Sequence, residues 1–160
     1  LVGSEMCIRD SRWKVMDAGL AAQQAGMQPL PESLLDAIRE GRGFIAFNMI
    51  GDAEGFAFVA EDGVRQVTMG GRIALSPTLK FRAESPLLCR FALVRDGKTI
   101  AAEEGRTFEY EVEDPGKYRI EAALPMPGEI AYSGDGAARN MAPWVKTNPI
   151  EVIEQEWPTP

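Results

Sequence analysis

The stretch FEYEVEDPGKYRIEA, residues 108–122, carries the strongest signal of the fold of this chain. Apolar residues occupy every second position on both sides of Asp114-Pro115-Gly116, and charged residues fill the positions between them. A period of two residues is typical of a β-strand with one buried face and one solvated face. Proline and glycine side by side favour a turn. The stretch therefore predicts two strands joined by a turn.

The same period extends outward from residue 44 to residue 153. Residues 44–50 are almost continuously apolar, which is typical of a strand covered on both faces. Asp62-Gly63 and Asp96-Gly97 each separate two apolar runs, and such dipeptides are strong signals of a β-hairpin. Asp62-Gly63 predicts a hairpin with a two-residue loop. No helical pattern lies between these runs. We therefore predict a mainly β chain, with an antiparallel two-layer Ig-like β-sandwich of about seven to nine strands over residues 44–154.

The segment before residue 44 has a different character. Residues 12–28 are rich in alanine and glutamine, and their apolar residues fall at a loose helical spacing. Pro31 suits the first turn of a second helix over residues 31–40, and Gly41 suits a left-handed end to it. The sequence thus predicts one or two N-terminal helices, which form a helical linker and a docking helix over residues 12–43.

Both ends of the chain are expected to lie outside the domain. Residues 1–11 resemble a string found in translated sequencing adaptor, so we interpret them as a non-native segment. On that interpretation the true N-terminus is missing, and the sequence predicts no cellular location. Residues 155–160, with two prolines, are expected to form a frayed tail.

Composition and charge exclude several classes of function. The net charge is −7, from 17 basic and 24 acidic residues, which argues against a nucleic-acid or anionic membrane surface. No apolar run approaches the roughly 20 residues that span a bilayer. The chain has two cysteines and no histidine. We expect Cys89 to be a small buried residue rather than a nucleophile, because no histidine is available to activate it.

Several short segments together carry a resemblance to a known family. They are Leu35–Phe44, Gly51–Phe56, Met69-Gly70, Val94–Gly97, Pro115–Glu121 and Pro143–Ile150. In this order they resemble the small β-sandwich that follows the catalytic domain in some bacterial metal-dependent phosphoesterases of the polymerase and histidinol phosphatase (PHP) superfamily. The motif positions that match in this sequence are Tyr118, Glu121, Trp144, Asn148 and Pro149.

The resemblance implies a non-catalytic role for this chain. The family's catalytic part is similar to an α/β barrel whose His and Asp/Glu side chains hold divalent metals such as Mn, Zn or Fe. None of those ligand motifs occurs here, so no catalytic residue, metal ligand or cofactor is carried over. The resemblance implies a C-terminal accessory domain that packs against the upstream catalytic domain of the same chain. It would brace the barrel or border the substrate entrance.

Two alternatives stay open. A free-standing carbohydrate- or protein-binding module would use Trp144 to stack on a ligand, and Asp135 in the loop of residues 125–142 as a weak candidate ligand for calcium. The structural interpretation is that Trp144 closes one end of the sandwich, that Asn148 bonds nearby backbone, and that Asp135 lies in a plain turn. A second alternative is an interaction module of a cell-surface protein.

Asp52 and Glu54 could form a carboxylate pair, but an exposed turn explains them equally. No small-molecule ligand is predicted.

Overall fold

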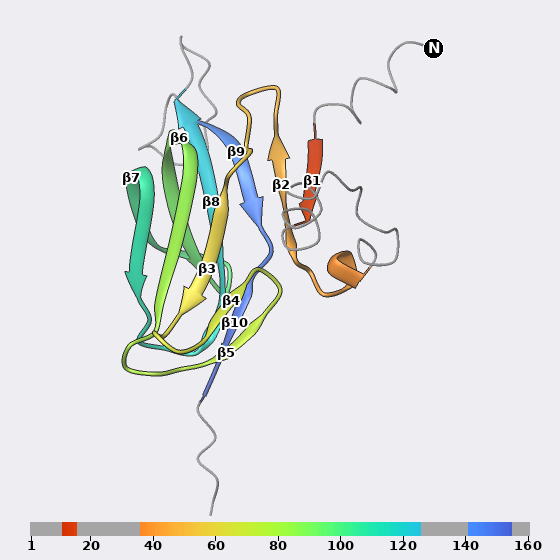
Figure 1. Cartoon of the computed structure of the whole chain (residues 1–160). Helices are drawn as coiled ribbons and strands as arrows, with labels where there is room; N and C mark the ends of the chain where they lie inside the picture. Colours follow the sequence, from red (N-terminus) through yellow and green to blue (C-terminus); the bar gives the residue numbers. More distant parts are fainter. Residues whose placement is uncertain (1–10, 16–35, 126–140, 155–160) are drawn as a thin grey trace, which may run out of the picture.

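The structure is a computed structural model that describes residues 36–125 and 141–154, together with the backbone of residues 11–15. Strands dominate this part of the chain (Figure 1). The ten strands among the described residues are β1 (Ser11–Val15), β2 (Gly43–Phe47), β3 (Ala57–Glu61), β4 (Gln66–Thr68), β5 (Arg72–Ala74), β6 (Lys80–Arg95), β7 (Lys98–Glu111), β8 (Gly116–Pro125), β9 (Met141–Thr147) and β10 (Ile150–Ile153). The prediction of a mainly β chain is confirmed.

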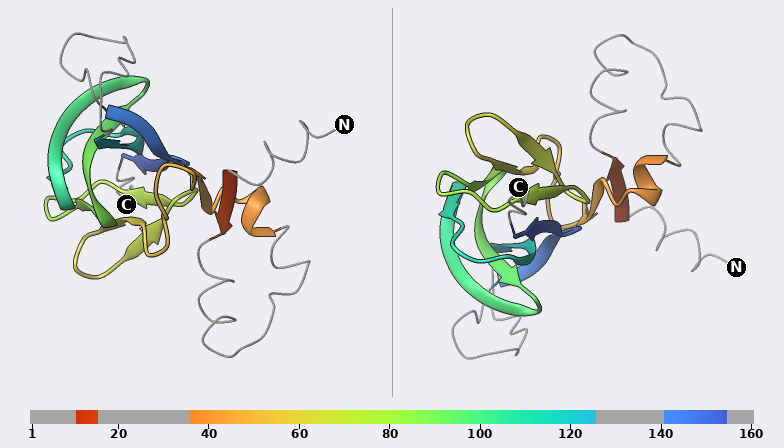
Figure 2. Two further views of the ribbon diagram at one scale, coloured as in Figure 1. Left: turned by 90° about the horizontal axis from the view of Figure 1, so that it is seen from above. Right: turned by 90° about the horizontal axis from the view of Figure 1, so that it is seen from below.

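All ten strands belong to one curled sheet. Its central path runs β1-β2-β9-β8-β6-β3-β4, with β7 on β6 and with β10 between β8 and β5. Every pairing is antiparallel except that of β10 with β5, which is parallel. Seen from above and below, β6 and β7 curve around one side of the molecule (Figure 2). The predicted antiparallel β architecture is therefore present as a single sheet that curls upon itself.

The long β6–β7 hairpin produces the curl. The first half of β6 pairs with β3 and its second half pairs with β8, and the register shifts between Glu84 and Cys89. Pro86 lies in this interval, where its missing N–H cannot be used in a ladder. The rings of Phe91 and Phe108, which belong to opposite halves of the hairpin, lie 5.9 Å apart. Both halves therefore face one core.

Aromatic side chains fill that core. Phe56 contacts Phe44, Phe91 and Trp144, with ring centroids 5.4, 6.3 and 6.1 Å away. Phe81 packs on Tyr118 at 4.8 Å, so the strands on either side of the bend meet. Large apolar rings of this size supply most of the hydrophobic stabilisation of a small β domain.

Both predicted hairpins form, with different loops. Asp96-Gly97 is a two-residue loop between the paired Arg95 and Lys98, with φ angles of 48° and 88°. The loop between β3 and β4 has four residues, because the ladder ends at the pair Glu61–Gln66. There Asp62 accepts hydrogen bonds from the backbone N–H groups of Val64 and Arg65 at 3.0 and 2.7 Å. The hairpin is confirmed, but its expected two-residue loop is wrong.

The N-terminal prediction needs a correction. The expected helix over residues 12–28 is wrong at residues 12–15, which form part of β1 and pair antiparallel with β2. Ladder bonds along the edge of β2 outweigh the weak helical preference of this stretch. Ser11, the last residue of the segment interpreted as non-native, begins β1. The remainder of the predicted linker, residues 16–35, lies outside the described residues, as do 1–10 and the predicted tail 155–160.

The end of the second predicted helix is confirmed. In the described part of the chain only residues 36–39 are helical. Gly41 has a φ of 70°, and its N–H donates to Ile38 O at 3.1 Å while the N–H of Arg42 donates to Ala37 O at 2.8 Å. This pair of bonds is a Schellman motif, the left-handed helix end that glycine favours. No helix within the described ranges is long and apolar enough to cross a bilayer.

Candidate functional site

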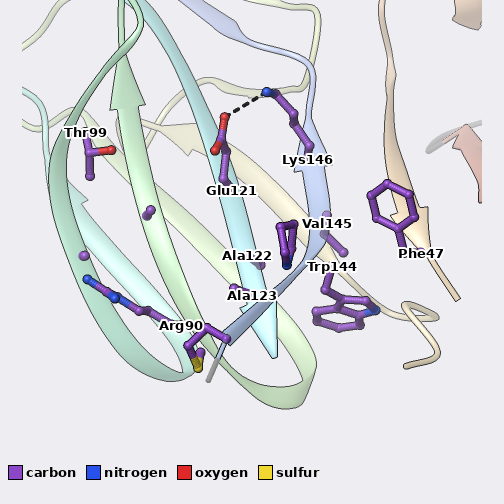
Figure 3. Close-up of a pocket in the computed structure, with 13 residues that line it drawn as sticks. Phe47, Arg90, Thr99, Glu121, Ala122, Ala123, Trp144, Val145 and Lys146 are labelled. Carbon is purple, nitrogen blue, oxygen red and sulfur yellow. Dashed lines mark ion pairs between the residues drawn. The ribbon is translucent and has the colours of Figure 1, made fainter. Parts of the chain in front are cut away.

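A hollow of about 470 Å³ lies on the outer face of β6–β9 (Figure 3). Alternation places it there: Phe91 and Leu93 of β6 point into the core, whereas Arg90 and Ala92 line the hollow. Its lining consists of Phe47, Arg90, Ala92, Thr99, Ala102, Glu121, Ala122, Ala123, Met141, Pro143, Trp144, Val145 and Lys146.

Small side chains form the floor of the hollow. Ala92 lies directly opposite Ala102 of β7, and Ala123 lies opposite Arg90. Alanine occupies outward positions at which charged residues stand elsewhere on these strands. The sheet face is therefore hollowed here, with larger side chains around it.

Glu121 and Lys146 form one side of the hollow, joined by the ion pair drawn in Figure 3. They are direct cross-strand neighbours, with 3.1 Å between Lys146 Nζ and Glu121 Oε1. Arg119 Nε also donates to Glu121, at 2.8 Å. Partial burial raises the pKa of Glu121, but the two cations together outweigh this and hold it below its ordinary value. Glu121 is therefore a stably ionised carboxylate.

Arg90 lies on the opposite side, toward β7 (Figure 3). Its side chain is partly buried, and Glu104 of β7 stands directly across from it in register. No ion pair joins Arg90 to another described residue. Thr99 adds a hydroxyl group to the same side of the hollow.

Trp144 is fully buried, and a β-bulge explains why. Ala122 pairs with Val145 and Ala123 pairs with Pro143, so Trp144 is the extra residue. Its Nε1–H donates to Gly51 O at 2.6 Å. With strict alternation from the exposed Lys146, Trp144 would point outward; the bulge turns it inward, where its ring offers no free face for stacking.

Because Gly51 has no side chain, Trp144 and two leucines can pack closely around its backbone. A Cβ atom at Gly51 would lie 2.7 Å from Leu124 Cδ1 and 2.8 Å from Leu87 Cδ1. Such distances are too short for carbon atoms, so any side chain here would displace the leucines. The motif positions Gly51 and Trp144 thus meet at one end of the sheet.

Tyr118 anchors the turn that lies directly before its own segment. Its hydroxyl donates to Asp114 O at 2.6 Å, across the turn that precedes β8. Burial raises the pKa of this phenol, so it stays protonated and able to donate. Arg95 also pairs with the Asp114 carboxylate. A tyrosine at the start of a strand, bonded to backbone a few residues upstream, is the arrangement called a tyrosine corner.

Asn148 and Pro149 form a second link between motif segments. Asn148 Nδ2 donates to Gly41 O at 2.9 Å, and Pro149 O accepts from the N–H of Gly70 at the same distance. A Cβ atom at Gly70, whose φ is 81°, would lie 2.0 Å from Glu40 O. We expected Asn148 to bond nearby backbone; its partner is 107 residues away in the sequence.

The other candidate residues do not converge with these. Asp52 and Glu54 are exposed, and Asp52 Oδ1 accepts from the N–H of Glu54 at 3.0 Å in a local turn. Cys89 is buried, and burial raises the pKa of its thiol. Asp135 lies outside the described residues. Across residues 36–125 and 141–154, no group of three His, Cys, Asp or Glu side chains could hold a metal ion.

Sequence reasoning missed most of the hollow. Of its lining, only Glu121 and Trp144 were among the predicted residues, and neither Arg90 nor any of the alanines was singled out. The available signal was the run of alanines at outward positions of three neighbouring strands, which cannot be recognised until the pairing register is known.

No protein-family model, curated protein or solved structure significantly matches this chain. The predicted resemblance to the PHP superfamily therefore rests on the short sequence segments alone.

Proposed function

We propose that the chain is a non-catalytic accessory domain of a PHP-type metal-dependent phosphoesterase, with the curled sheet as a variant of an Ig-like β-sandwich. One observation carries this proposal: the segments that resemble the family meet one another through hydrogen bonds. Trp144 bonds Gly51, and Asn148 bonds Gly41. Tyr118 bonds Asp114, directly before its own segment.

These contacts support a structural role for the motif residues. In each one a side-chain donor satisfies a backbone carbonyl, and a buried carbonyl without a partner is costly. Residues used in this way stabilise the fold and are not available to bind substrate. The tyrosine corner at Tyr118 also supports the Ig-like interpretation, because this feature marks the corner of a Greek-key sandwich.

Exposed apolar side chains support a partner domain. Met49 and Leu88 are 78 and 62% exposed. Large apolar side chains with this exposure can pack against another domain. In this proposal the catalytic domain covers them.

The upstream reading frame of the parent gene tests the proposal first. A His-x-His strand followed by spaced His and Asp residues would support it, and a secretory signal or unrelated domain directly upstream would overturn it. The parent protein, made with and without residues 44–154, then provides the biochemical test. We expect the deletion to lower the melting temperature of the catalytic part, whereas an unchanged melting temperature and activity would contradict an accessory role.

The chain itself gives a complementary test. Incubated with manganese or zinc, it should not hydrolyse p-nitrophenyl phosphate or its diester above the rate in buffer. Metal-dependent turnover that survives repurification would show that the chain is catalytic and would exclude the proposal.

The hollow favours a second candidate function, that of a ligand-binding module. Such a module could not use the ring of Trp144 for stacking, because that side chain is fully buried. It would use the outer face instead.

A further inference from the structure

We propose that the hollow on the outer face of β6–β9 binds an amphipathic monoanion, a carboxylate attached to a compact apolar body. The proposal is independent of the accessory role, since a domain that supports an enzyme can also hold a ligand on its free face.

The charges around the hollow favour an anion. Arg90 and Lys146 line it with Glu121 as the single lining carboxylate, and Arg119 also pairs with Glu121. With Glu104 counted beside Arg119, three cations stand against two carboxylates, on a chain whose net charge is −7. Glu104, opposite Arg90 on β7, is the nearest competing carboxylate by register. An acidic protein that keeps a local cationic excess around a hollow attracts anions to that place.

The apolar lining favours an organic ligand. Ala92, Ala102 and Ala123 form the floor, while Met141 and Pro143 supply larger apolar surface. A volume of about 470 Å³ falls within the range of small-molecule sites, which are mainly apolar with a few polar groups. A compact hydrocarbon or aromatic group would bury its surface over the alanines.

Arg90 is the group that would select a carboxylate. The guanidinium is planar and matches a carboxylate through two parallel hydrogen bonds. Arg119 and Lys146 are already engaged by Glu121, so one cation is left for the ligand. A phosphate dianion would need more positive charge and would be repelled by Glu121 and Glu104.

Titration of the ¹⁵N-labelled chain with 4-phenylbutyrate tests the proposal. We expect saturable shifts of the amide signals of Arg90, Ala92, Glu121 and Ala123, with a roughly millimolar affinity suited to so small a ligand. The neutral 4-phenylbutyramide should bind at least about tenfold more weakly, because it lacks the charge. Inorganic phosphate should not compete. An Ala-Ala-Phe peptide, with a free or amidated C-terminus, distinguishes a chain terminus from a free acid as the source of the carboxylate.

Four variants locate the site. Arg90→Met should weaken 4-phenylbutyrate binding about tenfold or more, and Glu104→Gln should strengthen it by removing the competitor. Ala92→Leu should block the floor, while the matched control Arg106→Met, on β7 but outside the lining, should bind as the original chain does. Melting temperatures show whether each variant is folded.

The following results would overturn the proposal: no saturable shifts in the original chain, shifts elsewhere on the sheet, equal binding of the amide, competition by phosphate, or full binding by folded Arg90→Met.

Discussion

The inner and outer faces of β6, β8 and β9 are built from alternate residues of the same strands, yet they differ completely. The inner face carries Phe91, Tyr118 and Ile120, all fully buried. The outer face carries alanines among charged side chains. Large rings inside stabilise the sheet through burial, whereas small residues outside leave room. The inner face therefore serves stability, whereas the outer face carries the hollow for which we propose a ligand.

The largest expected effect comes from removing the side chain of Trp144, the bulge residue that packs in the core. Trp144→Ala should lower the free energy of unfolding by about 3–5 kcal/mol, because it leaves a large cavity beside Phe56. Chemical denaturation followed by circular dichroism measures this. The control Met49→Ala, at a side chain 78% exposed, should change it by less than about 0.5 kcal/mol. If both variants lost the same free energy of unfolding, the result would contradict the buried position of Trp144.

A smaller effect is expected when only a polar atom of the inner face is removed. Tyr118→Phe keeps the ring against Phe81 but deletes the donor to Asp114 O, so we expect a loss of about 1–1.5 kcal/mol. The half-buried Tyr110 provides the matched control, and Tyr110→Phe should be close to neutral. If both variants unfold at the same denaturant concentration as the original chain, the tyrosine corner does not contribute to stability.

The smallest effect should come from the exposed β3–β4 loop. Backbone hydrogen bonds from Arg65 and Val64, with the Arg65 side chain, lower the pKa of Asp62 from 3.8 to about 2. Because the folded pKa lies below the unfolded one, the stabilisation is present above pH 3.8 and is lost as the pH falls toward 2. An NMR pH titration of the Asp62 side chain measures the folded pKa directly.

Asp62→Asn keeps the local geometry and should flatten this part of the pH dependence of stability. An Asp62 that titrates at its ordinary value would contradict the hydrogen-bonded loop. The exposed Asp52 is a suitable comparison, since its carboxylate accepts a single local backbone bond.

Sequence reasoning succeeded where the determinants are local. Alternation at residues 108–122 predicted β7 and β8, the dipeptides Asp62-Gly63 and Asp96-Gly97 predicted two hairpins, and Gly41 predicted a helix end. It failed at residues 12–15, where pairing with β2 overrides a weak helical pattern. The loop length at Asp62 was also wrong, since side-chain bonds there close a wider turn.

The sequence alone was sufficient to predict the strands and turns, because the causes of these elements lie within a few neighbouring residues. Other features depend on pairing register and on contacts between residues that are distant in the sequence, with separations of 93 and 107 positions. These features are the inward position of Trp144, the partner of Asn148 and the hollow beside Arg90. A one-residue bulge exchanges the two faces of a strand, and no local pattern reveals it. Only the folded sheet decides which side chains become core and which line the outer face.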